Sequence, residues 1–496
     1  MALVKLDMKC LASVLMLILG HTAVASAREV LLVQNASSGG VVYHVVPTTD
    51  SDDNELGSRS EDGDADGHHG ETYERYPVAE LNWWHVETPY LISLWVLFAS
   101  YAKIAFHLSN RLAKIFPESC LLIILGIIVG VIIYFAANDV IDDYTLDSDT
   151  FFLFLLPPIV LEAGYFMPNR AFFDNIGTIL LYAVLGTLFN CFAIGASLYG
   201  IVCLGWVSVP LDFLDCLVFS SLISAVDPVA VLAVFEEVHV NESLYILVFG
   251  ESLLNDAVTV VLYRMFKQFA VMGSENRQSV DYVLGLTSFF VISIGGTLIG
   301  IIWGLLTGFV TKFTDHVRVI EPLFVFLMSY LSYLTAEIFG FSGIMAIVFC
   351  GIIMKKYVEA NISQKSHTTV KYFMKMLSSI SETIIFMFLG LSAVQDDHVW
   401  DIAFILCTLF FCLFYRATGV IVLTALANWF RAIKVNKVEQ FIMAYGGLRG
   451  AIAFSLVVLL EAPTPGLQTK KALMSTTCLI VIFFTVFVQM HTCHLP

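Results

Sequence analysis

The chain has 496 residues, of which 58% are hydrophobic and 14% are charged, and its formal net charge is -16. About a quarter of the residues in an ordinary soluble domain are charged, so this composition excludes that class and is typical of a membrane protein. Because 42 acidic residues oppose 26 basic ones, we also expect no nucleic-acid partner.

Residues 1–27 have the pattern of a cleaved signal peptide. Lys5 and Lys9 give a basic start, residues 11–20 are apolar, and residues 25–27 read Ala-Ser-Ala, a small-x-small cleavage site. An uncleaved first membrane anchor is the alternative interpretation.

Residues 28–82 form an acidic segment that we predict to be extracellular and largely disordered. Between residues 28 and 90, thirteen acids face three arginines. Residues 50–70 have almost no large apolar side chain, and such a composition cannot form a packed core. Asn35 begins an Asn-Ala-Ser glycosylation sequon on the expected outer side.

Residues 83–490 hold the predicted membrane domain, an all-α bundle, and residues 491–496 are a short C-terminal end. A membrane-spanning helix needs about 20 mostly apolar residues. Thirteen stretches fit, near 90–108, 120–137, 150–167, 176–206, 213–235, 244–263, 283–312, 321–340, 341–358, 371–395, 402–429, 438–460 and 472–490. Twelve Lys and Arg residues lie in the loops of one side and five in those of the other. The positive-inside rule therefore places the N-terminus outside and the C-terminus in the cytoplasm.

With thirteen spans, spans 1–6 and 8–13 run in opposite directions, as in transporters built from inverted repeats. The corresponding spans five and twelve should then both be broken. Pro228 removes a backbone donor beside Asp227 in span five, and three glycines weaken span twelve: Gly446, Gly447 and Gly450. Unwound backbone at membrane depth is tolerated only where it is buried in protein or lines a cavity, so these breaks predict the position of a binding site.

Span six contains polar residues inside the apolar run 248–262. An ionisable group at that depth costs about 2.5 to 3.5 kcal/mol on insertion scales, which makes it a functional-site candidate. Asp256 can hold a proton or a hard cation, and competition between the two is the simplest physical route to exchange. Asn255 can add a neutral oxygen, and Ser252 lies one turn before Asp256 on the same face. Asp227 is expected to order the cavity or to contact the ion.

Six other charged residues in the spans each have two interpretations. Buried ion pairing is the alternative to a role in transport for Glu251, Arg416 and Arg449. Vestibule residue or structural acceptor are the two interpretations of Glu162, Glu337 and Glu382. The sequence Gly-Phe-Ser-Gly at 340–343 matches the G-x-S-G of intramembrane serine proteases. Such a protease needs a base beside the serine, whereas the histidines of this chain lie in the signal region, loops and span ends. We therefore expect no enzyme activity.

Five motifs are distinctive. They are F-F-L-F-L-L-P-P-I-V-L-E-A-G-Y-F at 151–166, A-V-D-P-V-A-V-L-A-V-F-E-E at 225–237, G-E-S-L-L-N-D-A-V-T-V-V-L at 250–262, S-E-T-I-I-F-M-F-L-G at 381–390 and Y-G-G-L-R-G-A-I-A-F-S at 445–455. Together they resemble the animal sodium/proton exchangers of the monovalent cation/proton antiporter superfamily, from about residue 83 to residue 488. The stretch 163–170 and the signal peptide are most similar to the epithelial plasma-membrane subgroup.

The resemblance implies that Asp256 is the ion-binding acid and that Asn255 marks an electroneutral member. It also implies one-for-one exchange, a homodimer, an elevator-like motion of the ion-binding bundle, and amiloride-type block in a region that begins with Phe151, Phe152, Leu153 and Phe154. Family members usually continue into a long regulatory tail, whereas this sequence stops at Pro496. We therefore expect no tail-binding regulators.

The sequence thus predicts a cell-membrane antiporter, apical in epithelia, that exchanges extracellular Na⁺ for cytoplasmic H⁺ and so regulates intracellular pH and sodium. No metal or other cofactor is expected beyond the transported ions themselves. Two alternatives stay open: exchange of K⁺ or mixed cations for H⁺, and a transport-impaired membrane scaffold.

Overall fold

The computed structural model describes residues 83–108, 118–136, 148–227, 241–272, 278–314, 320–394, 398–431, 433–460 and 464–489. Five predictions lie outside these ranges: the signal peptide at 1–27, the acidic segment at 28–82, the sequon at Asn35, the break at Pro228 and the end at 491–496. The chain divides into two units, Met1–Trp95 and Val96–Pro496. Only the start of one helix is described in the first unit.

The described residues are helical and include no strand, which confirms the predicted all-α class. The elements are α2 (Trp83–Leu108), α4 (Glu118–Ala136), α5 (Ser148–Thr150), η2 (Phe151–Leu155), α6 (Leu156–Phe166), α7 (Asn169–Leu180), η3 (Leu181–Gly186), α8 (Thr187–Cys203), α9 (Phe213–Ile223), α11 (Glu242–Met272), α12 (Ser279–Thr311), α13 (Glu321–Ile338), α14 (Gly343–Asn361), α15 (Gln364–Ser392), α16 (Ile402–Phe430), α17 (Lys437–Tyr445), α18 (Ala451–Val458), α19 (Pro465–Phe483) and η4 (Phe484–Gln489). The three η elements are π-helical turns within longer helices.

Helix occupies part of every one of the thirteen predicted spans. Within the described ranges, seven helical segments are long and apolar enough to cross a membrane: Glu118–Phe135, Asn169–Cys203, Ser243–Met272, Ser279–Thr311, Gln364–Ser392, Ile402–Phe430 and Gly466–Gln489. A multi-pass membrane protein is therefore supported, while thirteen crossings and an inverted repeat stay predictions.

The starts of three long helices are fixed by N-cap side chains. Ser342, Ser363 and Asp401 each accept a hydrogen bond from a backbone N–H in the first turn of α14, α15 and α16. Such caps satisfy one of the four backbone donors that a helix leaves unpaired at its start. The starts of these helices are thus marked by single residues.

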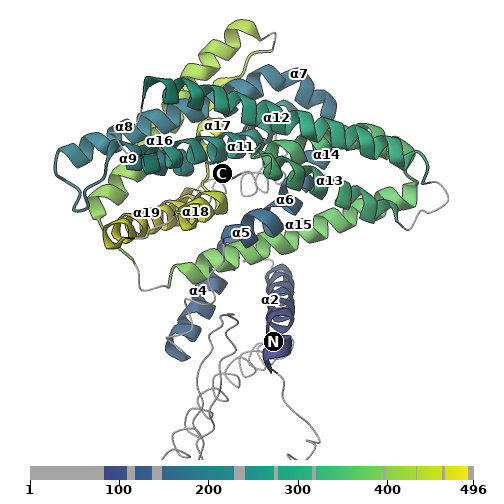
Figure 1. Ribbon diagram of the computed structural model, residues 1–496, viewed down its shortest axis with the longest axis horizontal. Helices are drawn as coiled ribbons and strands as arrows, with labels where there is room; N and C mark the ends of the chain where they lie inside the picture. Colours follow the sequence, from purple (N-terminus) through teal and green to yellow (C-terminus); the bar gives the residue numbers. More distant parts are fainter. Residues whose placement is uncertain are drawn as a thin grey trace, which may run out of the picture. The chain divides into compact units, whose positions relative to one another are not determined.

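The central helix of the second unit is α11 (Figure 1). Residues 246–263 are all buried, and α7, α9, η3 and α12 pack against the helix. A helix that is buried on every side is apolar all round, so any polar residue in it must find a partner inside the protein. This requirement is what positions the site.

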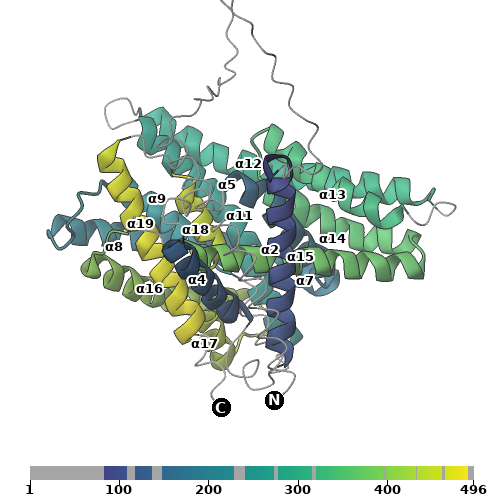
Figure 2. The ribbon, with the colours of Figure 1, turned by 90° about the horizontal axis from the view of Figure 1, so that it is seen from below.

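Glycines let other helices cross closely. At the contact of α12 with α14, a Cβ added to Gly300 would lie 2.2 Å from the Ala346 carbonyl oxygen. Where α4 crosses α15 (Figure 2), a Cβ on Gly126 would lie 2.1 Å from the Met387 carbonyl oxygen. Small residues at such crossings allow the backbones of membrane helices to approach.

Candidate ion-binding site

Four polar residues share the buried centre of α11. Glu251, Ser252 and Asn255 are each 1% exposed, and Asp256 is 4% exposed. The helix packs closely at this level because Gly250 has no side chain: a Cβ there would lie 2.9 Å from Cδ1 of Ile179 in α7. The polar residues predicted from span six therefore lie on one unbroken helix deep in the bundle.

The unwound residues after α9 and those between α17 and α18 meet beside α11. α9 ends at Ile223, and residues 224–227 follow without helical structure. Residues 446–450 separate α17 from α18. The interruptions are joined, because the backbone N–H of Asp227 donates to the carbonyl of Leu448 at 2.8 Å. The segment that follows α9 and the predicted weak point of span twelve thus come together in space, whereas the predicted break at Pro228 lies outside the described residues.

Glycines make this contact possible. A Cβ on Gly450 would lie 2.3 Å from Oδ2 of Asp227, and one on Gly447 would lie 2.8 Å from Nε of Arg416. Gly446 closes α17 by donating its N–H to the carbonyl of Ile442 at 2.8 Å. At two of the three predicted glycines, a side chain would therefore collide with a charged residue.

Asn255 and Ser252 connect α11 to the first interruption. The Asn255 Oδ1 accepts from the N–H of Val226 at 3.0 Å, and its Nδ2 donates to Oγ1 of Thr187 at 2.5 Å. The Ser252 hydroxyl donates to the carbonyl of Val226. Both backbone groups of one unwound residue are thus bound by α11, and the oxygen of Asn255 is used for this bond.

Asp256 follows Asn255 directly and lies one turn after Ser252 on α11. Its Oδ1 is buried and has no hydrogen-bond partner among the residues that the structure describes. The carboxyl group of Asp227 is close enough to act on it electrostatically. A buried carboxylate oxygen without a donor calls for a proton or a cation, since an unsatisfied buried charge is costly.

Glu251 and Arg416 form a bidentate ion pair. Nη1 of Arg416 donates to Oε1 of Glu251, and Nη2 donates to Oε2 at 3.1 Å and to the carbonyl of Met443 at 3.0 Å. Both side chains are buried. The pair links α16 to α11 and to the end of α17, and it is electrically neutral as a unit.

Arg449 has a different role from the other two charges. Its Nη1 donates to the carbonyls of Ser224 and Ala225 at 2.8 and 3.1 Å. Those carbonyls follow the last turn of α9, where a helix has no internal donors for them. The three charges expected as one group thus divide into an ion pair and a cation that caps the end of α9.

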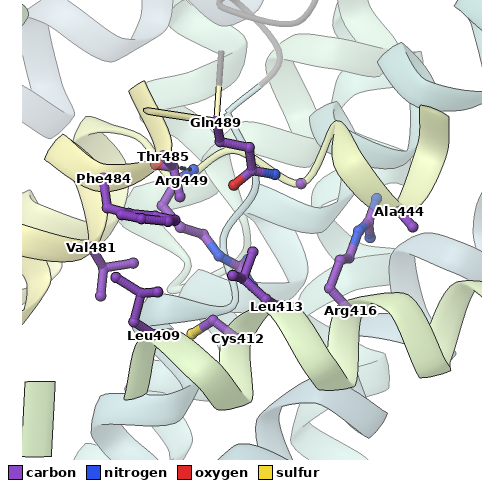
Figure 3. Close-up of a pocket in the computed structure, with 11 residues that line it drawn as sticks. Leu409, Cys412, Leu413, Arg416, Ala444, Arg449, Val481, Phe484, Thr485 and Gln489 are labelled. Atoms are coloured by element: carbon purple, nitrogen blue, oxygen red, sulfur yellow. Dashed lines mark hydrogen bonds between the residues drawn. The ribbon is translucent and has the colours of Figure 1, made fainter. Parts of the chain in front are cut away.

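A small cavity lies beside both arginines (Figure 3). Its volume is about 10 Å³, which is room for roughly one water molecule. The lining residues come from α16, α17, α19, η4 and the interruption: Leu409, Cys412, Leu413, Arg416, Ala444, Gly447, Arg449, Val481, Phe484, Thr485 and Gln489. Nε of Arg416 is buried and has no partner within the described part of the chain.

The other predicted acids belong to helices other than α11. Glu337 in α13 forms an ion pair with Arg264 at 2.9 Å. Glu382 in α15 accepts from the Ser378 hydroxyl at 3.5 Å. Glu162 lies in α6, which packs on α15, and its carboxyl group is near enough to that of Glu382 to interact electrostatically. These contacts leave their functional roles open.

The predicted inhibitor region, residues 151–154, lies in the π-helical turn η2. Two tyrosines of α13 bind its backbone: the hydroxyl of Tyr333 donates to the carbonyl of Phe152 at 2.8 Å, and that of Tyr330 to the carbonyl of Leu153 at 3.0 Å. A π-helical turn offers carbonyls that a regular helix would use internally. The tyrosines therefore hold this wide turn in place.

Sequence reasoning missed Thr187, Tyr330 and Tyr333. The signal for Thr187 is present, because Thr187 and Asn190 are polar residues three positions apart in an apolar span. The tyrosines carry no such signal, since aromatic residues at helical spacing fit an ordinary core or membrane interface.

Comparisons with known proteins agree on one family. The sequence pattern "Sodium/hydrogen exchanger, transmembrane" matches residues 96–494. The chain is 58% identical over 415 residues to sodium/hydrogen exchanger 2 of Oryctolagus cuniculus, covering 84% of this chain and 50% of that protein. It is 56% identical over 425 residues to sodium/hydrogen exchanger 3 of Homo sapiens, covering 85% and 50%. The chain thus spans about half the length of these curated relatives.

The fold is similar to a solved structure of the sodium proton antiporter MjNhaP1 from Methanocaldococcus jannaschii at pH 8. The TM-score is 0.61 at 18% sequence identity, and the match covers 82% of this chain and 95% of that chain. At this identity the likeness concerns the arrangement of helices.

Proposed function

Because this chain belongs to the sodium/hydrogen exchanger family, as its motifs predict, we propose that it is a secondary antiporter exchanging extracellular Na⁺ for cytoplasmic H⁺. The observation that carries the proposal is Asp256, a buried carboxylate whose Oδ1 has no hydrogen-bond partner among the described residues. Such a group can bind a proton or a sodium ion, but hardly both. Exchange follows when Asp256 is presented to the two sides of the membrane in turn.

The surrounding charges support an electroneutral cycle. The Glu251–Arg416 pair is neutral as a unit, and the Asn255 amide that bonds to Val226 and Thr187 carries no charge. One carboxylate then alternates between one proton and one sodium ion. The net charge moved in a full cycle is zero.

The joined interruptions support alternating access by a moving bundle. Residues 224–227 and 446–450 are linked by the Asp227–Leu448 bond and by Arg449, and α11 binds the first of them through Asn255. Elements that hold each other's unpaired backbone groups have to move together. We place the elevator-like motion in this group of helices.

The topology belongs to the same proposal. It comprises a cleaved signal peptide, thirteen crossings with inverted repeats, an outer N-terminus, a cytoplasmic C-terminus, a homodimer and an apical epithelial membrane. The positive-inside count supports the orientation, and the helices found in each predicted span support the crossings. Labels that are reactive from only one side, placed in the loops, test the orientation.

The decisive experiment is recovery of cytoplasmic pH after an acid load in exchanger-deficient cells that express this chain. We expect recovery with external Na⁺ and little with K⁺, and we expect Asp256→Asn to abolish it at unchanged surface protein. Recovery driven equally by K⁺ would favour mixed-cation exchange. No recovery from well-delivered protein would favour the scaffold alternative.

Voltage dependence tests the role of Asn255. Asn255→Asp adds a second carboxylate, so transport should become sensitive to membrane potential if that carboxylate stays ionised. The measurement is the exchange rate at several imposed potentials. Equal rates at all potentials would count against Asn255 setting the stoichiometry.

A further inference from the structure

Thr259 on α11 differs from the other buried helical threonines. It is 0% exposed, and its hydroxyl has no hydrogen-bond partner within the described ranges. Threonine in a helix usually donates to the carbonyl four residues earlier. Eight other buried threonines among the described residues do so: Thr187, Thr307, Thr311, Thr383, Thr408, Thr424, Thr476 and Thr477.

Thr259 is a neighbour of Asp256. Side chains three positions apart on a helix lie side by side, with Cβ atoms about 5–6 Å apart. Ser252 is the neighbour on the other side of Asp256, one turn earlier, and its hydroxyl is bound to Val226. The Asp256 Oδ1 and the Thr259 Oγ1 are therefore two buried oxygens, one turn apart, that find no partner in the described protein.

Two such oxygens call for a shared ligand. Burying a hydroxyl and a carboxylate without partners is costly, and buried polar atoms are nearly always satisfied by protein, water or an ion. A hard cation prefers oxygen ligands and combines carboxylate with neutral oxygens. The spacing of one helical turn lets one small ion contact both side chains.

We propose that the Thr259 hydroxyl is a ligand of the sodium ion that binds at Asp256, on the side away from Ser252. This inference rests on the proposed function. The hydroxyl cannot hold the exchanged proton, because it does not ionise in the physiological range. Thr259 thus strengthens Na⁺ binding without strengthening H⁺ binding, and it shifts the competition at Asp256 toward sodium.

Two measurements on the whole chain test this. The first is the external Na⁺ concentration for half-maximal pH recovery, together with the maximal rate and the dependence on cytoplasmic pH. The second is the rise in Tm of the purified protein with NaCl, against choline chloride at equal ionic strength. A bound ion stabilises the native state by mass action, so this second readout does not require transport.

Thr259→Val keeps the shape and removes the hydroxyl. We expect the half-maximal Na⁺ concentration to rise about tenfold, as for loss of one polar contact to a charged group, with the maximal rate and cytoplasmic pH dependence within about twofold. The Na⁺-dependent rise in Tm should need correspondingly more NaCl. Thr259→Ser keeps the hydroxyl, so its half-maximal Na⁺ concentration should stay within about threefold of the wild-type value.

Thr477→Val is the matched control, because that buried hydroxyl bonds to the carbonyl of Leu473 at 2.8 Å; it should leave Na⁺ dependence unchanged. The inference is overturned if Thr259→Val has wild-type Na⁺ dependence in both measurements, or if Thr259→Ser is as impaired as Thr259→Val. Absence of exchange in the wild type would reject the proposed function alone, since the Tm measurement would still decide the role of Thr259.

Discussion

α11 and α12 are consecutive helices of similar length and opposite character. They contain 31 and 33 residues, and each has an apolar window suitable for a membrane span, with a mean hydropathy of 1.5 and 2.2. Yet 94% of that window is buried in α11 and only 22% in α12. Apolarity therefore shows that a helix can enter a membrane, but not whether it faces protein or lipid.

The difference lies in the residues that interrupt the apolar pattern. α11 has Glu251, Asn255 and Asp256 at its centre, and polar groups at that depth need partners inside the protein. α12 has glycines on the side that meets α14 and large apolar residues on the exposed side. In lipid such an exposed face costs little, because lipid tails are as apolar as the side chains.

The largest effect should follow from breaking the ion pair that ties α16 to α11. Arg416→Met leaves the buried Glu251 carboxylate without its cation, so we expect the free energy of unfolding to fall by about 3–5 kcal/mol. Thermal unfolding in detergent measures it. The double variant Glu251→Gln/Arg416→Met has no unpaired charge and should regain at least half of the loss. Equal stability of the single variant and the wild type would show that the centre of α11 tolerates an unpaired charge.

The sequence predicted the helices and the residues at the centre of α11, because apolar runs and charges within them are visible along the chain. It did not predict which partner each polar group finds. Arg449 binds the carbonyls of Ser224 and Ala225 instead of an acid, and the Asn255 oxygen is used by Val226. These partners depend on where α9 stops, and that is decided by tertiary contacts. The glycines at 296, 300, 304 and 308 of α12 lie four residues apart, but nothing in the sequence identifies α14 as the helix that they meet.

A smaller effect should follow from adding one methyl group to the glycine face of α12. Gly300→Ala places Cβ 2.2 Å from the Ala346 carbonyl, so the helices must separate, at a cost of about 1–3 kcal/mol. Gly177→Ala in α7 is the control, since nothing lies within 4 Å of a Cβ there and alanine favours a helix by about 0.5–1 kcal/mol. If both variants change the unfolding temperature alike, close packing does not hold α12 on α14.

Asp401 offers a third environment, the end of a helix. Burial raises the pKa of its carboxyl group, but hydrogen bonds from the Ser208 hydroxyl and from the N–H groups of Ser208 and Phe404 lower the pKa by more. A lowered folded pKa stabilises the protein above the unfolded value of about 3.9, and this stability is lost as pH falls through the folded pKa. We expect Asp401→Asn to cost about 1 kcal/mol at pH 6, and we expect this difference to shrink as the pH falls below the unfolded value and through the folded pKa. A difference in Tm that is constant from pH 6 to pH 3 would contradict this.

The smallest effect should come from the exposed face of α12, and it tests the comparison most directly because the same substitution can be made in both helices. Leu253 in α11 is 2% exposed and Leu298 in α12 is 53% exposed. Leu253→Ala opens a cavity and should cost about 2–5 kcal/mol. Leu298→Ala replaces a leucine that contacts lipid or detergent by an alanine that does the same. The free energy of unfolding should therefore stay within about 0.5 kcal/mol of the wild type. A larger loss at Leu298 that shrinks as the protein is diluted would mean that this face packs against a second copy of the chain, because dilution dissociates the wild-type pair and removes the contact that the variant lacks. That outcome would place the proposed homodimer on α12, whereas a loss independent of concentration would contradict the assignment of this face to lipid.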